Sequence, residues 1–218
     1  MELHGAVALV TGANRGLGKA YAEALVAAGA KVYAGARDPQ TVTSEGVIPV
    51  QLDVTDADQV AKAAAELTDV DLVVNNAGIG ALGTPLTADL DDARRLMEVN
   101  YIGLLRVSQA FAPRLAGGAL VNVLSVASFR PAPMLSTYSA TKAAAWSITT
   151  ALREELTDTL VVGVHAGFID TDLAAAVPAE DKIPPSQVVE ATLEALRTNQ
   201  TEVLADDISR LAKAALVA

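Results

Sequence analysis

The chain has 218 residues, 51% of them hydrophobic and only 4% aromatic, which suits one well-buried core of helices packed closely on a sheet. Its 26 acidic and 16 basic residues give a net charge of −10 at pH 7, which disfavours binding to nucleic acid or to an anionic membrane. With no cysteine and only two histidines, His4 and His165, the chain lacks obvious material for a disulfide framework, a thiol nucleophile, a Ser-His-Asp triad or a metal site.

Short apolar runs alternate with longer helical patterns along the whole chain. Strands are predicted at residues 6–11, 31–36, 47–52, 70–75, 119–125, 159–165 and 201–205, and helices at 16–28, 56–67, 89–112, 138–156 and 186–198. This alternation, with continuously apolar strands, is typical of a parallel sheet covered by helices on both faces. We expect a single α/β domain over residues 1–218, a doubly wound three-layer sandwich of Rossmann type. Residues 167–184 show no periodic pattern, and loops of that length are usually functional lids or disordered segments.

A glycine-rich turn follows the first predicted strand, with the sequence Thr11-Gly12-Ala13-Asn14-Arg15-Gly16-Leu17-Gly18. Glycines at these positions allow a tight turn and let the backbone approach a pyrophosphate, while the next helix directs its free N–H groups and positive dipole end at the anion. The spacing is G-x-x-x-G-x-G rather than the usual G-x-G-x-x-G. The turn predicts a dinucleotide site.

Tyr138 and Lys142 lie four residues apart within the predicted helix at 138–156, and so on the same helical face. A neighbouring positive charge favours the phenolate and lowers a tyrosine pKa from its usual value of about 10. The pair is therefore a candidate general acid-base. Taken alone, such a pair is more often an exposed aromatic ring beside a solvated charge.

Four motifs in order make the chain resemble the short-chain dehydrogenase/reductases over nearly its whole length. They are the glycine turn, Asn75-Asn76-Ala77-Gly78 after the fourth strand, Asn100, and Ser125 thirteen residues before the Tyr138/Lys142 pair. The resemblance implies a catalytic set of Asn100, Ser125, Tyr138 and Lys142. Tyr138 would exchange a proton with a substrate carbonyl or alcohol oxygen while hydride moves to or from nicotinamide C4. Ser125 would bind the same oxygen, Lys142 would lower the Tyr138 pKa and bind the nicotinamide ribose, and Asn100 would hold a water.

The same resemblance implies the residues that hold the cofactor. They are Gly12, Asn14, Arg15, Gly16, Leu17, Gly18, Arg37, Asp53, Val54, Asn75, Ala77, Gly78, Tyr138, Lys142, Gly167, Ile169 and Thr171. Asp53 would contact the adenine, and Ile169 and Thr171 would meet the carboxamide. One departure is Ala166, where family members commonly carry proline; alanine frees the backbone φ angle there.

The charge pattern after the second strand favours NADPH over NADH. A strand that selects NAD usually ends in an acidic residue for the ribose 2′-hydroxyl, whereas this position is Ala36. Arg37 follows it, and Arg15 lies in the glycine turn, so both could clamp a 2′-phosphate through charge-assisted hydrogen bonds. The alternative is two solvated arginines, and Asp38 beside Arg37 complicates the NADPH interpretation.

An apolar substrate pocket is expected from Ser125, Phe129, Met134, Leu135 and Phe168. It suits a small or medium ketone or aldehyde, although these side chains could instead complete the core. By resemblance, the helix at 138–156 would pack against its copy in a homodimer or homotetramer.

The predicted function is NADPH-dependent carbonyl reduction on a small-molecule substrate, with no metal and with neither a nucleic acid nor a membrane partner. A 3-oxoacyl carrier-protein reductase and a dinucleotide sensor without turnover stay open as alternatives. No apolar run approaches the roughly eighteen residues of a membrane span, and the first five residues lack the basic start of a signal peptide. We therefore expect a cytoplasmic protein.

Overall fold

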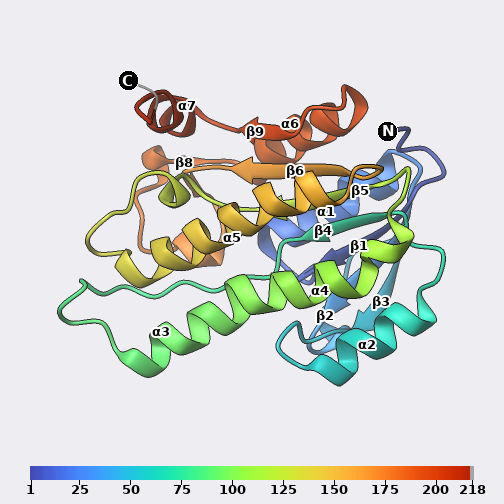
Figure 1. Cartoon of the computed structure of the whole chain (residues 1–218), viewed down its shortest axis with the longest axis horizontal. Coiled ribbons are helices and arrows are strands. Elements are labelled where there is room, and N and C mark those ends of the chain that lie inside the picture. The colour runs from blue at the N-terminus through green and yellow to red at the C-terminus, as the bar shows by residue number, and fades with distance from the viewer. Residues whose placement is uncertain (217–218) are drawn as a thin grey trace.

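Seven parallel strands form the centre of the molecule in the order β3-β2-β1-β4-β5-β6-β9 (Figure 1). The computed structural model describes residues 1–216. Its central strands are β1 (Val7–Thr11), β2 (Lys31–Ala36), β3 (Val47–Gln51), β4 (Leu72–Asn75), β5 (Ala119–Val123), β6 (Leu160–His165) and β9 (Glu202–Leu204). The strand order runs outward from β1 in one direction and from β4 in the other, which confirms the doubly wound Rossmann-type sheet and creates a crevice at its switch point.

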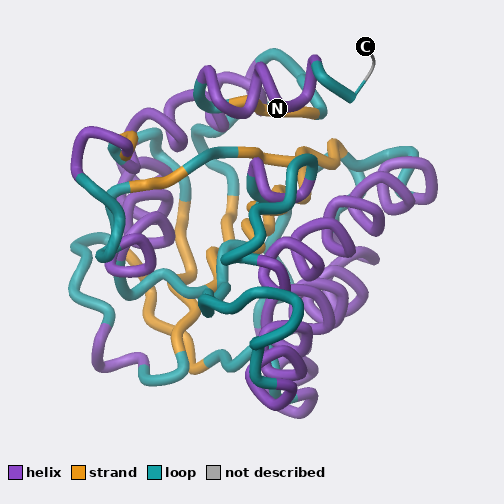
Figure 2. Tube along the Cα trace, turned by 90° about the vertical axis from the view of Figure 1, so that its left-hand side faces the viewer, coloured by secondary structure: helices purple, strands orange, loops and turns teal. Residues whose placement is uncertain are grey.

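Helices cover both faces of the sheet (Figures 1 and 2). One face carries α1 (Gly16–Ala27) and α6 (Pro185–Arg197); the other carries α2 (Ala57–Glu66), α3 (Leu90–Met97), α4 (Leu104–Phe111) and α5 (Ser136–Glu155). Along β1, Ala8 and Val10 pack toward α1 and α6, while Leu9 between them joins the opposite core. Both faces of the strand are therefore buried, which explains its continuous apolar run. Among residues 1–216, none of the helices has the length and apolar character needed to cross a bilayer.

The helix predicted over residues 89–112 is interrupted. A wide π-helical turn at Glu98–Gly103 separates α3 from α4 and contains the buried Asn100. Gly103 lies where this turn approaches Val54, and a Cβ on it would come within 2.7 Å of the valine methyl carbon. Turns of this kind inside helices frequently occur at functional sites.

Residues 206–218, for which the sequence analysis predicted no element, contain the helix α7 (Asp207–Ala214). Asp206 begins it, because its carboxylate accepts a hydrogen bond from the Ser209 amide at 2.7 Å. The predicted lid at 167–184 contains a short parallel pair of strands, β7 (Phe168–Ile169) and β8 (Lys182–Ile183).

Candidate active site

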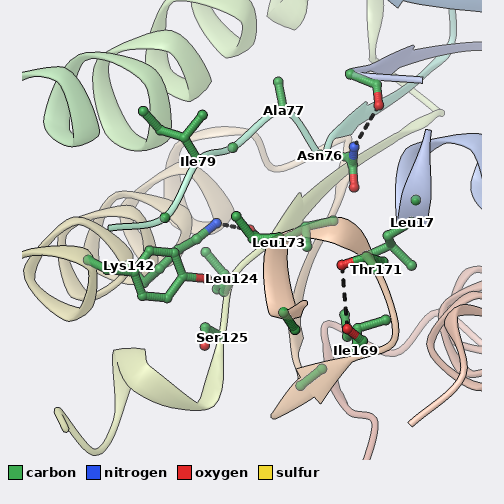
Figure 3. A pocket seen from close by; sticks show the side chains of 18 of the residues that line it. Leu17, Asn76, Ala77, Ile79, Leu124, Ser125, Lys142, Ile169, Thr171 and Leu173 are labelled. Carbon is green, nitrogen blue, oxygen red and sulfur yellow. Dashed lines mark hydrogen bonds between the residues drawn. The ribbon is translucent and has the colours of Figure 1, made fainter. Parts of the chain in front are cut away.

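A cavity of about 1420 Å³ opens at the carboxyl ends of the central strands. Its lining comes from the glycine turn after β1, residues 76–80 after β4, residues 123–127 after β5, one face of α5, the lid and α7. Figure 3 shows Lys142 and Ser125 on one side of this space, with Leu17 and Thr171 on the other. In open parallel sheets, ligands bind outside the carboxyl ends of the strands at such a switch point.

The glycine turn holds its shape through close backbone contacts. Gly12 and Gly16 have φ angles of 66° and 53°, a region that favours glycine. A Cβ on Gly18 would lie 2.2 Å from the Gly12 carbonyl oxygen, so only glycine fits there. The side-chain amide of Asn76 donates to the Thr11 carbonyl at 2.9 Å, and the backbone N–H of Asn76 donates to the Thr11 hydroxyl. These two bonds tie the turn to the end of β4.

The amino end of α1 is available to an anion. Arg15 occupies the position before the helix in an extended conformation, and its side chain makes no capping hydrogen bond. The first N–H groups of a helix have no partner within the helix and carry the positive end of its dipole. The turn and the helix end together can therefore hold a phosphate group.

Tyr138 and Lys142 both face the cavity from α5, but their relation differs from the expectation. The Lys142 ammonium donates to the Val123 carbonyl at 2.9 Å and lies 5.8 Å from the centroid of the Tyr138 ring. Burial raises the pKa of the Tyr138 phenol, opposed by hydrogen bonding with Ser125, and burial lowers the pKa of Lys142 to about 8. The prediction that Lys142 lowers the Tyr138 pKa is wrong here, because loss of water around the phenol dominates.

Ser125 lines the cavity at the end of β5 and is 8% exposed. It begins a short 3₁₀ turn, Val126–Ser128, and its hydroxyl oxygen accepts a hydrogen bond from the Ala127 amide at 3.1 Å. Because a hydroxyl carries one donor and two acceptor lone pairs, the Ser125 hydrogen remains available to donate, either to the neighbouring Tyr138 oxygen or to a ligand in the cavity.

Asn100 does not line the cavity, and its amide bonds to protein groups. It donates to the Ile79 carbonyl at 2.9 Å and to the Thr141 hydroxyl at 3.1 Å, and its oxygen accepts from the Ile79 amide at 2.9 Å. Asn100 thus ties the segment after β4 to α5. The water-holding role expected of Asn100 stays a prediction, because its side-chain oxygen has a second lone pair beyond the one used by Ile79.

Most of the predicted cofactor residues line the cavity together. They are Gly12, Asn14, Arg15, Gly16, Leu17, Gly18, Arg37, Asp53, Val54, Ala77, Gly78, Tyr138, Lys142, Gly167, Ile169 and Thr171. Asn75 does not. It is 4% exposed, and its amide donates at 3.0 Å to Ser108 and Asn122 in the core. Asn76, which belongs to the same expected motif, does line the cavity.

The two arginines expected at a 2′-phosphate both lie at the cavity and are both exposed. Arg37 follows Ala36 at the end of β2. The Arg15 guanidinium lies 3.0 Å from the Asp172 carboxylate of the lid in an exposed ion pair. Asp38 caps the short 3₁₀ turn Pro39–Thr41 by accepting from the Gln40 amide at 3.0 Å. Arg15 and Asp172 therefore connect the glycine turn with the lid.

Only some of the residues predicted for the substrate pocket line the cavity. Leu135 and Phe168 lie on the cavity beside Ser125, whereas Met134 is 53% exposed and does not line it. Phe129 is buried in an aromatic cluster, stacked on His165 at 4.0 Å and edge-on to Trp146 at 4.8 Å. For Phe129, completion of the core is therefore the correct alternative.

An apolar wall comes from the lid, as expected, and from the tail, which sequence reasoning missed. It consists of Leu173, Ala174, Ile208, Leu211, Ala212 and Ala215. The last four have the spacing i, i+3, i+4 and i+7, which is the stripe of an amphipathic helix. This periodicity is visible in the sequence and could have predicted the helix at the tail.

Comparisons with known proteins agree with this geometry. The family model for short chain dehydrogenases matches residues 6–182. A short chain dehydrogenase from Burkholderia cenocepacia J2315, solved in complex with NADP, is 40% identical and covers 100% of this chain and 95% of its own, with a TM-score of 0.96. A short chain dehydrogenase/reductase from Burkholderia phymatum, solved in complex with NAD, is 26% identical and covers 99% of this chain and 94% of its own, with a TM-score of 0.87.

Among curated sequences, an uncharacterized oxidoreductase of Staphylococcus aureus (strain USA300) is 33% identical over 208 residues, which are 87% of this chain and 90% of that protein. Fold, cavity, motifs and relatives therefore agree over nearly the whole chain. The chain belongs to the short-chain dehydrogenase/reductase family and is an NAD(P)-dependent oxidoreductase.

Proposed function

We propose that the protein reduces an apolar ketone or aldehyde to an alcohol, with NADPH as the reductant and Tyr138 as the proton donor. The observation that carries this proposal is the convergence of Ser125, Tyr138 and Lys142 on the same cavity as the glycine turn. The cavity thus brings the phenol of Tyr138, which can exchange a proton, together with the glycine turn, which can hold a dinucleotide phosphate.

The residues present fit a nicotinamide dinucleotide. A Cβ on Gly18 would lie 2.2 Å from the Gly12 carbonyl oxygen, so glycine closes the turn tightly, and the turn leads into a helix end without a side-chain cap, which suits a pyrophosphate. The residues proposed to hold the nucleotide are Asn14, Leu17, Asp53, Val54, Ala77, Gly78, Gly167, Ile169 and Thr171, together with the turn glycines. The bound cofactor would supply hydride from C4 of its nicotinamide.

The proton chemistry follows from the directions in which burial shifts the pKa values of Tyr138 and Lys142. Burial raises the pKa of Tyr138, so its phenol is protonated at neutral pH and can donate to a carbonyl oxygen. Ser125 keeps its hydroxyl hydrogen available, since the oxygen already accepts from Ala127, and we propose that it donates to the same oxygen. Lys142, with a pKa lowered to about 8, is still mainly cationic at pH 7 and is proposed to bind ribose hydroxyls.

The preference for NADPH rests on Ala36, Arg37 and Arg15. Ala36 places no carboxylate at the end of β2, and the two exposed arginines offer paired N–H donors to a 2′-phosphate. The relative of 40% identity was solved with NADP and the one of 26% identity with NAD, which supports the same preference.

The proposed substrate class follows from the lid and α7. Leu173 is 59% exposed, Ile208 53% and Leu211 72%, and all three line the cavity beside the half-exposed Phe168. Apolar side chains gathered at one opening mark a site for an apolar group. We propose that this wall receives the apolar part of the carbonyl substrate. The cytoplasmic location and the homodimer or homotetramer implied by the resemblance stay predictions.

The experiment is to follow NADPH absorbance with a panel of aliphatic and aromatic ketones and aldehydes that includes a 3-oxoacyl thioester. The Tyr138→Phe variant should lose about 10²–10⁴ of the rate, as expected for removal of a general acid. Tyr33→Phe is the matched control, because Tyr33 bonds to Asp69 away from the cavity. An unchanged rate for Tyr138→Phe would remove the mechanism, and tight NADPH binding without turnover on any compound would favour a dinucleotide sensor.

A further inference from the structure

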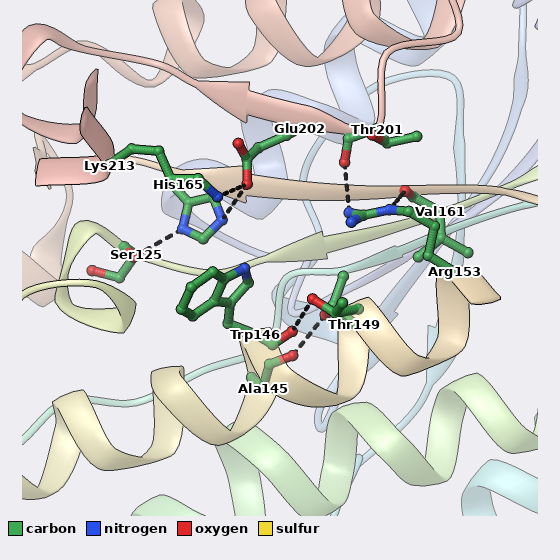
Figure 4. A network of polar contacts seen from close by, with 11 residues as sticks. Ser125, Ala145, Trp146, Thr149, Arg153, Val161, His165, Thr201, Glu202 and Lys213 are labelled. Atoms are coloured by element: carbon green, nitrogen blue, oxygen red, sulfur yellow. Dashed lines mark hydrogen bonds and ion pairs between the residues drawn. The ribbon is translucent and has the colours of Figure 1, made fainter. Parts of the chain in front are cut away.

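His165 is fully buried at the end of β6, next to the strand that carries Ser125 (Figure 4). Its Nδ1 lies 3.1 Å from the Ser125 carbonyl oxygen. A carbonyl oxygen only accepts hydrogen bonds, so Nδ1 carries the hydrogen and donates it. The neutral ring therefore has its proton on the side of Ser125 and a bare Nε2 on the other side.

The ring has no room to turn. It stacks on Phe129 with centroids 4.0 Å apart and an interplanar angle of 25°, and Trp146 approaches edge-on at 6.2 Å. A half-turn of the ring would keep its plane on Phe129 but would put a carbon atom in place of Nδ1, so the bond to the Ser125 carbonyl would be lost. The direction of the Nδ1–H donor is thus fixed by the surrounding packing.

The second ring nitrogen faces an ion pair that leads to the tail. Nε2 is buried without a hydrogen-bond partner and lies 3.9 Å from a Glu202 carboxylate oxygen. Lys213 of α7 holds the same oxygen at 2.6 Å, and its ammonium also lies over the rings of Phe129 and Trp146, at 4.8 and 5.0 Å. Glu202, Lys213 and His165 therefore form one cluster between α7 and β6.

The peptide that His165 contacts belongs to the start of the short turn that carries the Ser125 hydroxyl. The Ser125 carbonyl accepts two hydrogen bonds, from the Ser128 amide at 3.0 Å and from His165, while the hydroxyl oxygen accepts from Ala127. The first and last of these bonds lie within the short turn itself. His165 is thus a hydrogen-bond donor to this peptide from outside the turn.

We propose that His165 is a positioning residue for Ser125, and that through the Glu202–Lys213 pair it couples helix α7, a wall of the substrate cavity, to the catalytic serine. The proposal rests on the proposed function, because it concerns the direction in which Ser125 presents its hydroxyl to a substrate oxygen. A misplacement of about 1 Å at such a group can lower a rate by about a hundredfold.

Two substitutions at this position separate hydrogen bonding from packing. His165→Phe keeps an aromatic ring beside Phe129 but removes the donor to Ser125, while His165→Asn places an amide N–H near the position of Nδ1. We expect His165→Phe to lower kcat by about tenfold to a hundredfold with the KM for NADPH unchanged, and His165→Asn to recover most of the loss. Thr192→Val, which breaks a buried hydrogen bond to Tyr21 away from the cavity, should leave kcat unchanged.

A primary isotope effect with NADPH deuterated at C4 distinguishes positioning from general damage. It should rise in His165→Phe, because the chemical step becomes slower relative to the others. An unchanged kcat in His165→Phe, or an equal loss in the two variants, would overturn the proposal. Absence of turnover in the unmodified protein would instead overturn the proposed function.

A third variant keeps the test independent of substitutions in the core. Lys213→Met retains the aliphatic stem near Phe129 and Trp146 but removes the cation from Glu202. We expect kcat to fall in Lys213→Met and to recover in Lys213→Arg, which restores the pair. Equal kcat values in the unmodified protein, Lys213→Met and Lys213→Arg would show that the Glu202–Lys213 pair does not couple α7 to Ser125.

Discussion

Acid should destabilise this protein through His165 before most of its carboxylates titrate. Burial lowers the pKa of His165 from its ordinary value of 6.5 to about 4, with the nearby Glu202 acting in the opposite direction and Lys213 and Arg153 in the same direction. The folded protein therefore binds this proton more weakly than the unfolded chain does. The resulting stability is fully present above pH 6.5 and is lost as the pH falls from there toward 4.

The magnitude follows from the two pKa values. Between pH 7 and pH 5, the unfolded chain gains most of a proton at this position while the folded protein gains about a tenth, so about 2 kcal/mol of unfolding free energy is lost. Urea unfolding at pH 7, 6 and 5 measures this loss. The comparison is with His165→Asn, which has no ionisable group there and should lose about 2 kcal/mol less over the same range.

The control is His4→Asn, because His4 is exposed near the amino terminus. It should follow the unmodified protein at each pH. The contributions of other titrating groups largely cancel in the comparison, because each variant retains them. Parallel loss of stability in the unmodified protein and in His165→Asn would refute the reasoning, since burial of a neutral imidazole would then contribute nothing to the acid response.

Three further predictions concern the cavity. Gly18→Ala places a Cβ 2.2 Å from the Gly12 carbonyl oxygen, so NADPH binding measured by fluorescence titration should weaken by about tenfold or more. Arg37→Ala should weaken NADPH binding by about 1.5–3 kcal/mol without affecting NADH binding. Equal losses of binding free energy for the two cofactors would contradict a role of Arg37 at the 2′-phosphate. Leu211→Ala should raise the KM of the bulkiest accepted carbonyl compound by about fivefold to 150-fold, because a lost apolar contact costs about 1–3 kcal/mol, whereas Leu86→Ala, exposed and outside the cavity lining, should not.

The parts of the site that the sequence predicted are those fixed by local geometry. The glycine turn was predictable because Gly12 and Gly16 have positive φ angles and Gly18 meets backbone, requirements that no other residue meets easily. Tyr138 and Lys142 share a helical face by their spacing alone. Their pKa values were not predictable, because these depend on how the surrounding chain excludes water from the cavity wall.

The missed features depend on tertiary contacts. Asn75 and Asn76 are adjacent, and only the end of β4 decides that the first enters the core and the second the cavity. The interruption at Asn100 follows from its bonds to Ile79 and to Thr141 in another helix, contacts that helical periodicity does not report.

Asp206 compensates for the proline that Ala166 replaces beside the cavity. Proline would restrict the backbone before Gly167, and alanine does not. The turn is fixed from outside instead, because the Val126 amide donates to the Ala166 carbonyl at 2.9 Å and the Gly167 amide donates to the Asp206 carboxylate at 2.6 Å. The same carboxylate caps α7 through the Ser209 amide. One buried side chain thus fixes both the turn and the helix that forms the apolar wall, so a movement of α7 toward a substrate must also displace the turn at Gly167.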